Sequence, residues 1–202
     1  MKRSTKRWGG AAAALIVLAA GQANGAAGPF LPNVFMGARL GTSVKAWRSL
    51  PPPPGVGLDA TPACSNEVGA ARVPGFRLSA TEAATGVVAC AWVSRFGHTV
   101  LSHSVKVLGA YRTSDLAWLF TRGRLSEIRF ATSIDAYDAL TGRFDKLYGR
   151  PVRVVRDRLR TSTGRLPRVR ETWHAAAGTV VLEDPMASDP TLLRVRFTGR
   201  RA

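Results

Sequence analysis

The sequence predicts an α+β domain: an antiparallel sheet of hairpins with one main helix, at about residues 134–148, packed on one face, plus a short N-terminal helix. Residues 87–131 contain apolar runs broken by turn residues, which is typical of hairpins. Residues 133–149 repeat apolar side chains at helical spacing, and residues 152–198 alternate as strands do. Hairpins, then one helix, then further hairpins indicate a helix covering one face of an antiparallel sheet.

The first twenty-five residues have the three parts of a secretory signal peptide. A basic start is followed by an apolar run from Ala11 to Ala20 and then by small residues up to Ala26. Ten apolar residues rise only about 15 Å as a helix, half of a membrane core, so we expect cleavage rather than a membrane anchor. No cysteine follows the run, which argues against a lipoprotein. We expect a mature chain that starts between residues 24 and 28, lacks a membrane span, and works in the periplasm or outside the cell.

Export gives the two cysteines of the chain, Cys64 and Cys90, a simple interpretation. In an oxidising compartment such a pair forms a disulfide. The alternative is a nucleophilic thiol with a histidine partner, which would have to stay reduced outside the cytoplasm. We therefore expect the disulfide.

After the leader we expect an irregular segment, 26–60, and then a single α+β domain, 61–202. Residues 41–50 of the segment predict a short helix, capped by Thr42 or Ser43, because three apolar residues recur at helical spacing: Val44, Trp47 and Leu50. The four prolines at 51–54 end this helix and begin a stiff connector. The alternative interpretation of the prolines is a polyproline ligand for a partner.

Two hairpins are expected before the main helix. Residues 87–108 break at Gly97-His98, and residues 116–120 are followed by a turn through Arg122-Gly123 and a strand over 125–131. A two-residue turn and a three-residue bulged turn both fit around Gly123. The bulged version pairs Leu116 with Ile128 and gives the better core face.

The main helix has clear signals at both ends. Ser133 can cap it, Gly149 can stop it and Pro151 prevents its continuation. Its apolar stripe is formed by Ile134, Tyr137, Leu140, Phe144 and Leu147. The strands expected after it are 152–160, 168–174, 179–183 and 192–198.

A helix led by Gly41-Thr42-Ser43, the hairpin pattern Trp118-Leu119-Phe120-x-x-Gly123-Arg124-Leu125, and a helix ended by Tyr148-Gly149-Arg150-Pro151 occur together in this chain. In these features it resembles small exported bacterial α+β proteins of unknown function, and the helix-plus-hairpin modules of BamE-like and β-lactamase-inhibitor-like proteins. The resemblance covers about residues 37–50 and 114–183, and it implies binding or scaffolding rather than catalysis. BamE-like proteins are anchored through a cysteine after the signal peptide, which this chain lacks.

No residue set predicts catalysis, a metal site or a cofactor. His98 and His103 are five residues apart, without the carboxylates or thiols that metal sites use. Ser102-His103-Ser104 lacks the context of a nucleophile elbow. Gly55-Val56-Gly57 has Ala60 where a phosphate-binding loop needs a third glycine. We expect no enzyme, no catalytic or metal-ligating residue, and no small-molecule cofactor.

The unusual property of the chain is its net charge of +16. The leader holds four of the cations, which leaves +12 for the rest. Of the 29 basic residues, 24 are arginine and 5 are lysine, a bias that a GC-rich genome explains. Such a bias does not explain why aspartate and glutamate total only 13. A basic surface is therefore expected.

Seven arginines in three of the four strands expected after the main helix form the candidate site. Strand alternation suggests that they gather on the face opposite the main helix, where guanidinium groups bind phosphate or carboxylate; they are Arg156, Arg158, Arg160, Arg168, Arg170, Arg194 and Arg196. The partner expected is an acidic protein or an anionic envelope component, and the compartment argues against nucleic acid. The alternatives are an envelope enzyme with an unmarked active site, an inhibitor of a periplasmic enzyme, and a solvated face with no ligand.

Overall fold

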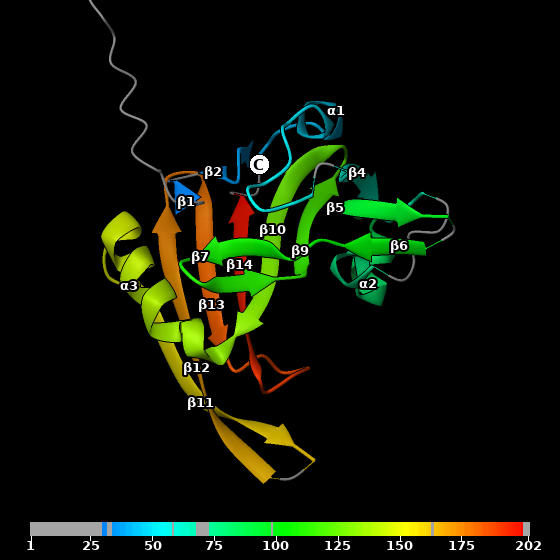
Figure 1. Ribbon diagram of the computed structural model, residues 1–202. Helices are drawn as coiled ribbons and strands as arrows, with labels where there is room; N and C mark the ends of the chain where they lie inside the picture. The colour runs from blue at the N-terminus through cyan, green and yellow to red at the C-terminus, as the bar shows by residue number, and fades with distance from the viewer. Residues whose placement is uncertain are drawn as a thin grey trace, which may run out of the picture.

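A large antiparallel β-sheet dominates the protein (Figure 1). The computed structural model describes residues 30–31, 34–57, 59–67, 73–97, 99–162 and 164–199, so the predicted leader and His98 lie outside it. The nine strands of this sheet are β4 (Thr61–Cys64), β5 (Val88–Phe96), β6 (Thr99–Ser102), β9 (Asp115–Thr121), β10 (Arg124–Ser133), β11 (Arg153–Thr161), β12 (Gly164–Ala175), β13 (Gly178–Asp184) and β14 (Leu192–Gly199). Their order is β11-β12-β13-β14-β10-β9-β5-β4, with β6 beside β5.

The α+β expectation is wrong, because strands make up 54% and helices only 17% of the described residues. The main helix, α3 (Tyr137–Tyr148), packs Phe144 against Trp173 of β12 and Phe197 of β14. The sheet is too wide for one helix of this length. The rest of the same face is covered by other elements: β2 (Val34–Phe35), β3 (Ala38–Arg39), α1 (Val44–Arg48), β7 (Val105–Leu108) and β8 (Tyr111–Thr113). The short strand β1 (Phe30–Leu31) pairs with β2.

The ends of the main helix lie where the sequence places them. Ser133 accepts a hydrogen bond from the Asp135 backbone, a 3-10 turn follows over Ile134–Ala136, and Gly149 ends α3 with φ of 80°. Leu140 and Phe144 are fully buried, whereas Ile134 is 40% exposed. Ile134 precedes the α-helical part, so it falls off the expected stripe.

Three tryptophans hold the N-terminal segment against the sheet. Ser43 caps α1, and Trp47 of that helix is fully buried. Its ring lies 5.4 Å from that of Trp118 in β9 and 6.0 Å from that of Trp92 in β5, between ring centroids. The segment expected to be irregular therefore supplies part of the main core.

The opposite face of the sheet is also buried at one end. A second apolar cluster includes Ala89 and Ala91 of β5 and Leu119 of β9. It is covered by the 3-10 turn η2 (Pro74–Phe76), and the chain then continues into helix α2 (Ala80–Ala84). Gly75 permits this close packing, because a Cβ there would lie 2.6 Å from the carbonyl oxygen of Leu116. The turn η2 contacts both β5 and β9, and α2 follows it in the chain.

The register of the hairpin formed by β9 and β10 differs from the expected one. Its turn has two residues, Arg122 and Gly123, both with positive φ as a type I′ turn requires. The register then shifts between Leu125 and Glu127, so Leu116 pairs with Phe130 and not with Ile128. The tight turn and the bulge, treated as alternatives from the sequence, both occur.

The expected disulfide is present between β4 and β5. Cys64 and Cys90 lie directly opposite each other in the antiparallel pair, with Cα atoms 4.0 Å apart. The bond closes a loop of 26 positions and fixes the edge strand β4 to the sheet. Among the described residues there is no helix long and apolar enough to cross a membrane.

Replacing both cysteines with serine should lower the free energy of unfolding by about 3 kcal/mol, because the unfolded chain regains the entropy of the opened loop. Chemical denaturation without reductant measures this change. Wild-type protein treated with reductant should unfold at the same midpoint as Cys64→Ser/Cys90→Ser, and equal midpoints for oxidised wild type and the variant would contradict the prediction.

Candidate functional site

The register of the last strands divides the seven predicted arginines between two faces. Residues paired across antiparallel strands share a face. Arg158 pairs with Pro167, whereas Arg168 pairs with Asp157, so Arg158 and Arg168 point to opposite sides of the sheet. The expectation of one shared face is wrong. One group is Arg156, Arg158 and Arg160 of β11; the other is Arg168 and Arg170 of β12 with Arg194 and Arg196 of β14.

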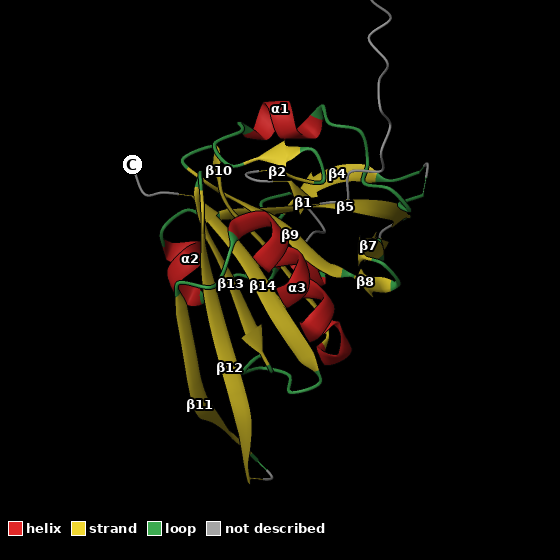
Figure 2. Ribbon diagram, turned by 90° about the vertical axis from the view of Figure 1, so that its left-hand side faces the viewer, coloured by secondary structure: helices red, strands yellow, loops and turns green. Residues whose placement is uncertain are grey.

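The first group lies on a hairpin that projects from the sheet. β12 pairs with β13 only from Val169 onward, so no third strand of the described chain lies beside residues 157–161 and 164–168. Figures 1 and 2 show this end of β11 and β12 reaching past the rest of the molecule. Five residues of strand extend about 16 Å. We call residues 156–168 the ribbon.

On one face of the ribbon, all of the charged residues are arginines. Arg156, Arg158 and Arg160 follow one another at about 7 Å intervals, which is two residues of a strand. Arg165 lies directly across from Arg160, where cross-strand Cβ atoms are about 5 Å apart. All four are exposed, and none forms an ion pair with a carboxylate of the described chain.

The acid of the ribbon is engaged on its other face. Arg168 donates to both carboxylate oxygens of Asp157, at 2.7 and 2.6 Å, and also to Glu183 at 3.1 Å. These bonds hold the pKa of Asp157 below its ordinary value. Asp157 is thereby committed to Arg168 and does not neutralise the arginines on the opposite face.

Two arginines of the second group border a cavity of about 620 Å³ between α2 and strands β10 and β14. Arg194 and Arg196 line it together with Arg77 and Arg129, which the sequence analysis did not single out. The remaining polar lining comes from Ser79, Thr81, Glu82, Asp115 and Ser188, and Leu78 and Met186 add apolar surface. Arg170 lies in β12, where it pairs with Glu183 of β13, and it is not part of the lining.

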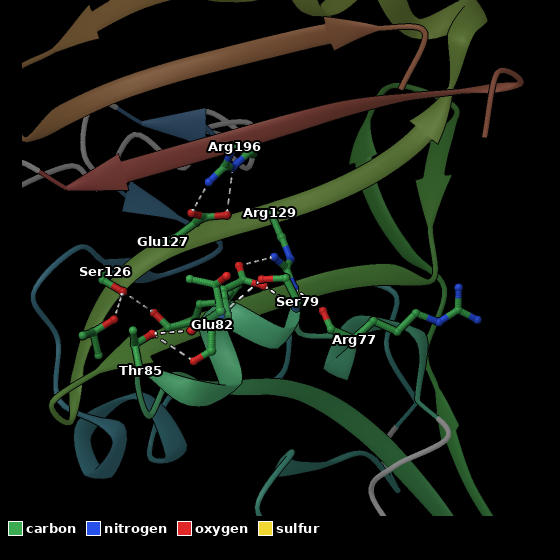
Figure 3. Close-up of polar contacts among 11 residues, drawn as sticks. Arg77, Ser79, Glu82, Thr85, Ser126, Glu127, Arg129 and Arg196 are labelled. Carbon is green, nitrogen blue, oxygen red and sulfur yellow. Dashed lines mark hydrogen bonds and ion pairs between the residues drawn. The ribbon is translucent and has the colours of Figure 1, made fainter. Parts of the chain in front are cut away.

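Two walls of the cavity are fixed by ion pairs, which Figure 3 shows. Arg196 donates to both carboxylate oxygens of Glu127, at 3.0 and 2.8 Å. Arg129 donates to Glu82 at 2.7 Å and also to the backbone carbonyl of Arg77. Glu82 in turn accepts from the Ser79 backbone at 2.7 Å, completing the capping box of α2, and these partners lower its pKa despite the opposing effect of burial.

Asp115, at the start of β9, is a half-buried acid in the lining of the cavity. Burial raises the pKa of its carboxyl above the ordinary value, although Arg129, Arg194 and Arg77 act in the opposite direction. No hydrogen bond to this carboxylate is found among the described residues. Asp115 therefore acts as a partly dehydrated internal counter-charge for the surrounding guanidinium groups.

A serine, a histidine and an aspartate also meet on the face of the sheet opposite the cavity, but they are not arranged as a hydrolase triad. The Ser94 hydroxyl donates to the Asp59 carboxylate, so the His103 Nε2–H, 2.6 Å away, must donate to the Ser94 oxygen. A nucleophilic serine instead gives its proton to the histidine. Ser94 is also only 3% exposed. The described residues contain no cluster of three or more His, Cys, Asp or Glu side chains suited to a metal ion.

Sequence reasoning missed half of the arginines around the cavity because they come from distant segments. Arg77 and Arg129 are separated from Arg194 by many residues, and only the strand order joins them. One local signal was present in Ser79-x-x-Glu82, the pattern of a capping box. It would have located α2, although not the cavity under it.

Replacing Asp115 with asparagine should raise the thermal midpoint at neutral pH. A carboxyl whose pKa is raised by folding stabilises the protein most below its unfolded pKa, and this contribution is lost as pH rises through the folded value. The amide has no charge to dehydrate, so the gain should disappear below about pH 3.9, where the aspartic acid is also neutral.

Asp157→Asn is the control with the opposite sign, because the pKa of Asp157 is lowered by folding. It should reduce the midpoint at neutral pH, and this loss should fade as pH falls through the folded pKa of Asp157. Thermal melts from neutral to acidic pH test both variants. A lower midpoint for Asp115→Asn at neutral pH would contradict the assignment.

The comparisons with known proteins do not supply a family. No family model matches the chain, and neither a curated protein nor a solved structure matches it. The resemblance to BamE-like and β-lactamase-inhibitor-like modules therefore stays a prediction. The function has to be argued from the geometry of the residues themselves.

Proposed function

We propose that the protein is an exported, non-catalytic binding module of the cell envelope, which captures an anionic partner on the arginine face of its ribbon. The observation that carries the proposal is the set of four exposed guanidinium groups on one ribbon face, none of them paired with a carboxylate of the described chain. The basic leader and the disulfide support export.

The arrangement of these arginines costs stability in the absence of a ligand. Like charges directly opposite each other in a sheet are destabilising, and Arg160 faces Arg165. A two-stranded hairpin is itself only marginally stable in water. An anionic partner would relieve the repulsion, and guanidinium groups bind phosphate, sulfate and carboxylate through paired hydrogen bonds.

The shape of the ribbon favours a linear polyanion over a lipid surface. Its arginines lie in a row along one strand, and a linear polymer with regularly repeated charges can contact several of them at once. The loop at the tip contains Thr161, Ser162 and Gly164, which have no apolar side chain to enter a membrane. The ribbon also has no aromatic residue on which nucleic-acid bases would stack. An acidic envelope polysaccharide is the partner that fits these features.

Catalysis is not supported by the groups that would have to perform it. Cys90 is bonded to Cys64, so it is not a thiol nucleophile. The Ser94 hydroxyl donates to Asp59 rather than to His103. The Glu82 carboxylate, the one acid placed beside Asp115 in the cavity, is held by Ser79 and Arg129.

The test is the triple variant Arg156→Gln/Arg158→Gln/Arg160→Gln, with heparin as the polyanion probe. Each arginine lost should reduce the slope of log affinity against log salt by about one. Folding should be nearly unchanged, because exposed substitutions usually alter stability by less than about 0.5 kcal/mol each. Calorimetric titration over a series of salt concentrations gives both affinity and slope.

The matched control removes the same charge elsewhere, through Arg39→Gln/Lys106→Gln/Arg150→Gln, three exposed cations outside the ribbon. The control should keep most of the affinity. Equal losses for the two triple variants would mean that heparin responds to net charge alone, and the ribbon proposal would be wrong. Stronger loss on anionic vesicles than on heparin would replace the polymer with a lipid surface.

A further inference from the structure

We infer that the cavity under α2 is a second, separate site, which binds a small organic anion through Arg77 and Arg194. It lies on the face of the sheet opposite the ribbon arginines, since Arg194 and Arg196 share a face with Arg170 and not with Arg158. The site is therefore independent of the polyanion surface proposed above, and either can exist without the other.

Arg77 and Arg194 are the cations of the cavity that form no ion pair with a carboxylate of the described residues. The nearest polar contacts of Arg194 are weak: the Ser188 hydroxyl at 3.4 Å and the Met186 sulfur at 3.9 Å. The guanidinium of Arg77 extends away from the pair of Glu82 and Arg129 (Figure 3), and it has no hydrogen bond within the described chain. Both groups keep their donors for a ligand.

Arg129 and Arg196 contribute fixed positive walls instead. Each is held by a glutamate, Glu82 or Glu127, so its position does not depend on a ligand. Glu127 is only 8% exposed, and it accepts two hydrogen bonds from the half-exposed Arg196, which fix the position of that guanidinium group. A ligand would enter a site whose back is already ordered.

Asp115 is an acid inside the same lining as the four arginines. Its carboxylate is attracted electrostatically by Arg77, Arg129 and Arg194, yet it makes no hydrogen bond to any of them. A ligand carboxylate or phosphate would satisfy the arginines better, but it would meet repulsion from Asp115. The aspartate thus limits affinity, so its neutralisation should increase binding.

The volume and lining define the class of ligand. A cavity of about 620 Å³ is in the range that holds a small molecule rather than a single inorganic ion. Leu78 and Met186 give it apolar surface beside the four arginines. The ligand expected is a compact organic anion with one carboxylate or phosphate group and an apolar body.

Calorimetric titration of the full chain with phenyl phosphate, benzoate and inorganic phosphate tests the inference. We expect the two organic anions to bind more tightly than inorganic phosphate. Arg77→Gln/Arg194→Gln should weaken their binding by about tenfold or more for each arginine, the value of a hydrogen bond to a charged group. Asp115→Asn should bind them more tightly than wild type.

The matched control is Arg39→Gln/Lys106→Gln, which removes the same charge at two exposed cations outside both the ribbon and the cavity and should leave these affinities unchanged. Loss of phenyl phosphate binding in this control as well would assign the effect to net charge and overturn the site. The site is also wrong if neither wild type nor Asp115→Asn binds any of the three probes, whatever happens to heparin. Loss of heparin binding alone would count against the ribbon and leave the cavity intact.

Discussion

The alternation of side chains along the antiparallel strands decides on which face of the sheet each arginine of the strands lies. In β14, Leu193, Val195 and Phe197 point to the main core, while Arg194 and Arg196 point to the other side. Toward β5 the sheet is buried on both faces, in the middle it is buried on one, and at the ribbon it is almost entirely exposed. The cavity lies where the second apolar cluster ends, and the ribbon begins where both cores end. The two candidate sites therefore follow from the same gradient of burial.

The distribution of acids is as important as the abundance of arginine. The chain has only 13 acidic residues, and several are used to hold particular arginines in place. Glu127 fixes Arg196, Glu82 fixes Arg129 and also caps α2, and Glu67 contacts both Arg48 and Arg95. The four arginines of the ribbon face have no ion pair with a carboxylate of the described residues, and in the cavity the same holds for Arg77 and Arg194.

Local signals in the sequence were sufficient for local structure and insufficient for the sheet. Ser133 and Gly149 marked the main helix, and the alternation of residues 192–198 marked β14, because caps and alternation depend on neighbouring residues. The face shared by Arg158 and Arg168 depends instead on the turn at 161–164 that sets the register of β11 against β12. A shift of one residue reverses that outcome. The fold class was missed for a similar reason, because the short strands that widen the sheet and cover it have little periodicity of their own.

The position of Asp157 shows how the ribbon can be both held together and strongly charged. A projecting hairpin with few apolar contacts needs some cross-strand bond, and the paired hydrogen bonds from Arg168 to Asp157 provide one. Leu159, which is 8% exposed, adds the apolar contribution on the same face. An acid at 156 or 158 would have held the strands equally well, but it would have neutralised the file of arginines. The pair of Asp157 and Arg168 lies on the face opposite the exposed arginines. The ribbon is therefore stabilised without losing the positive surface on which the proposed function depends.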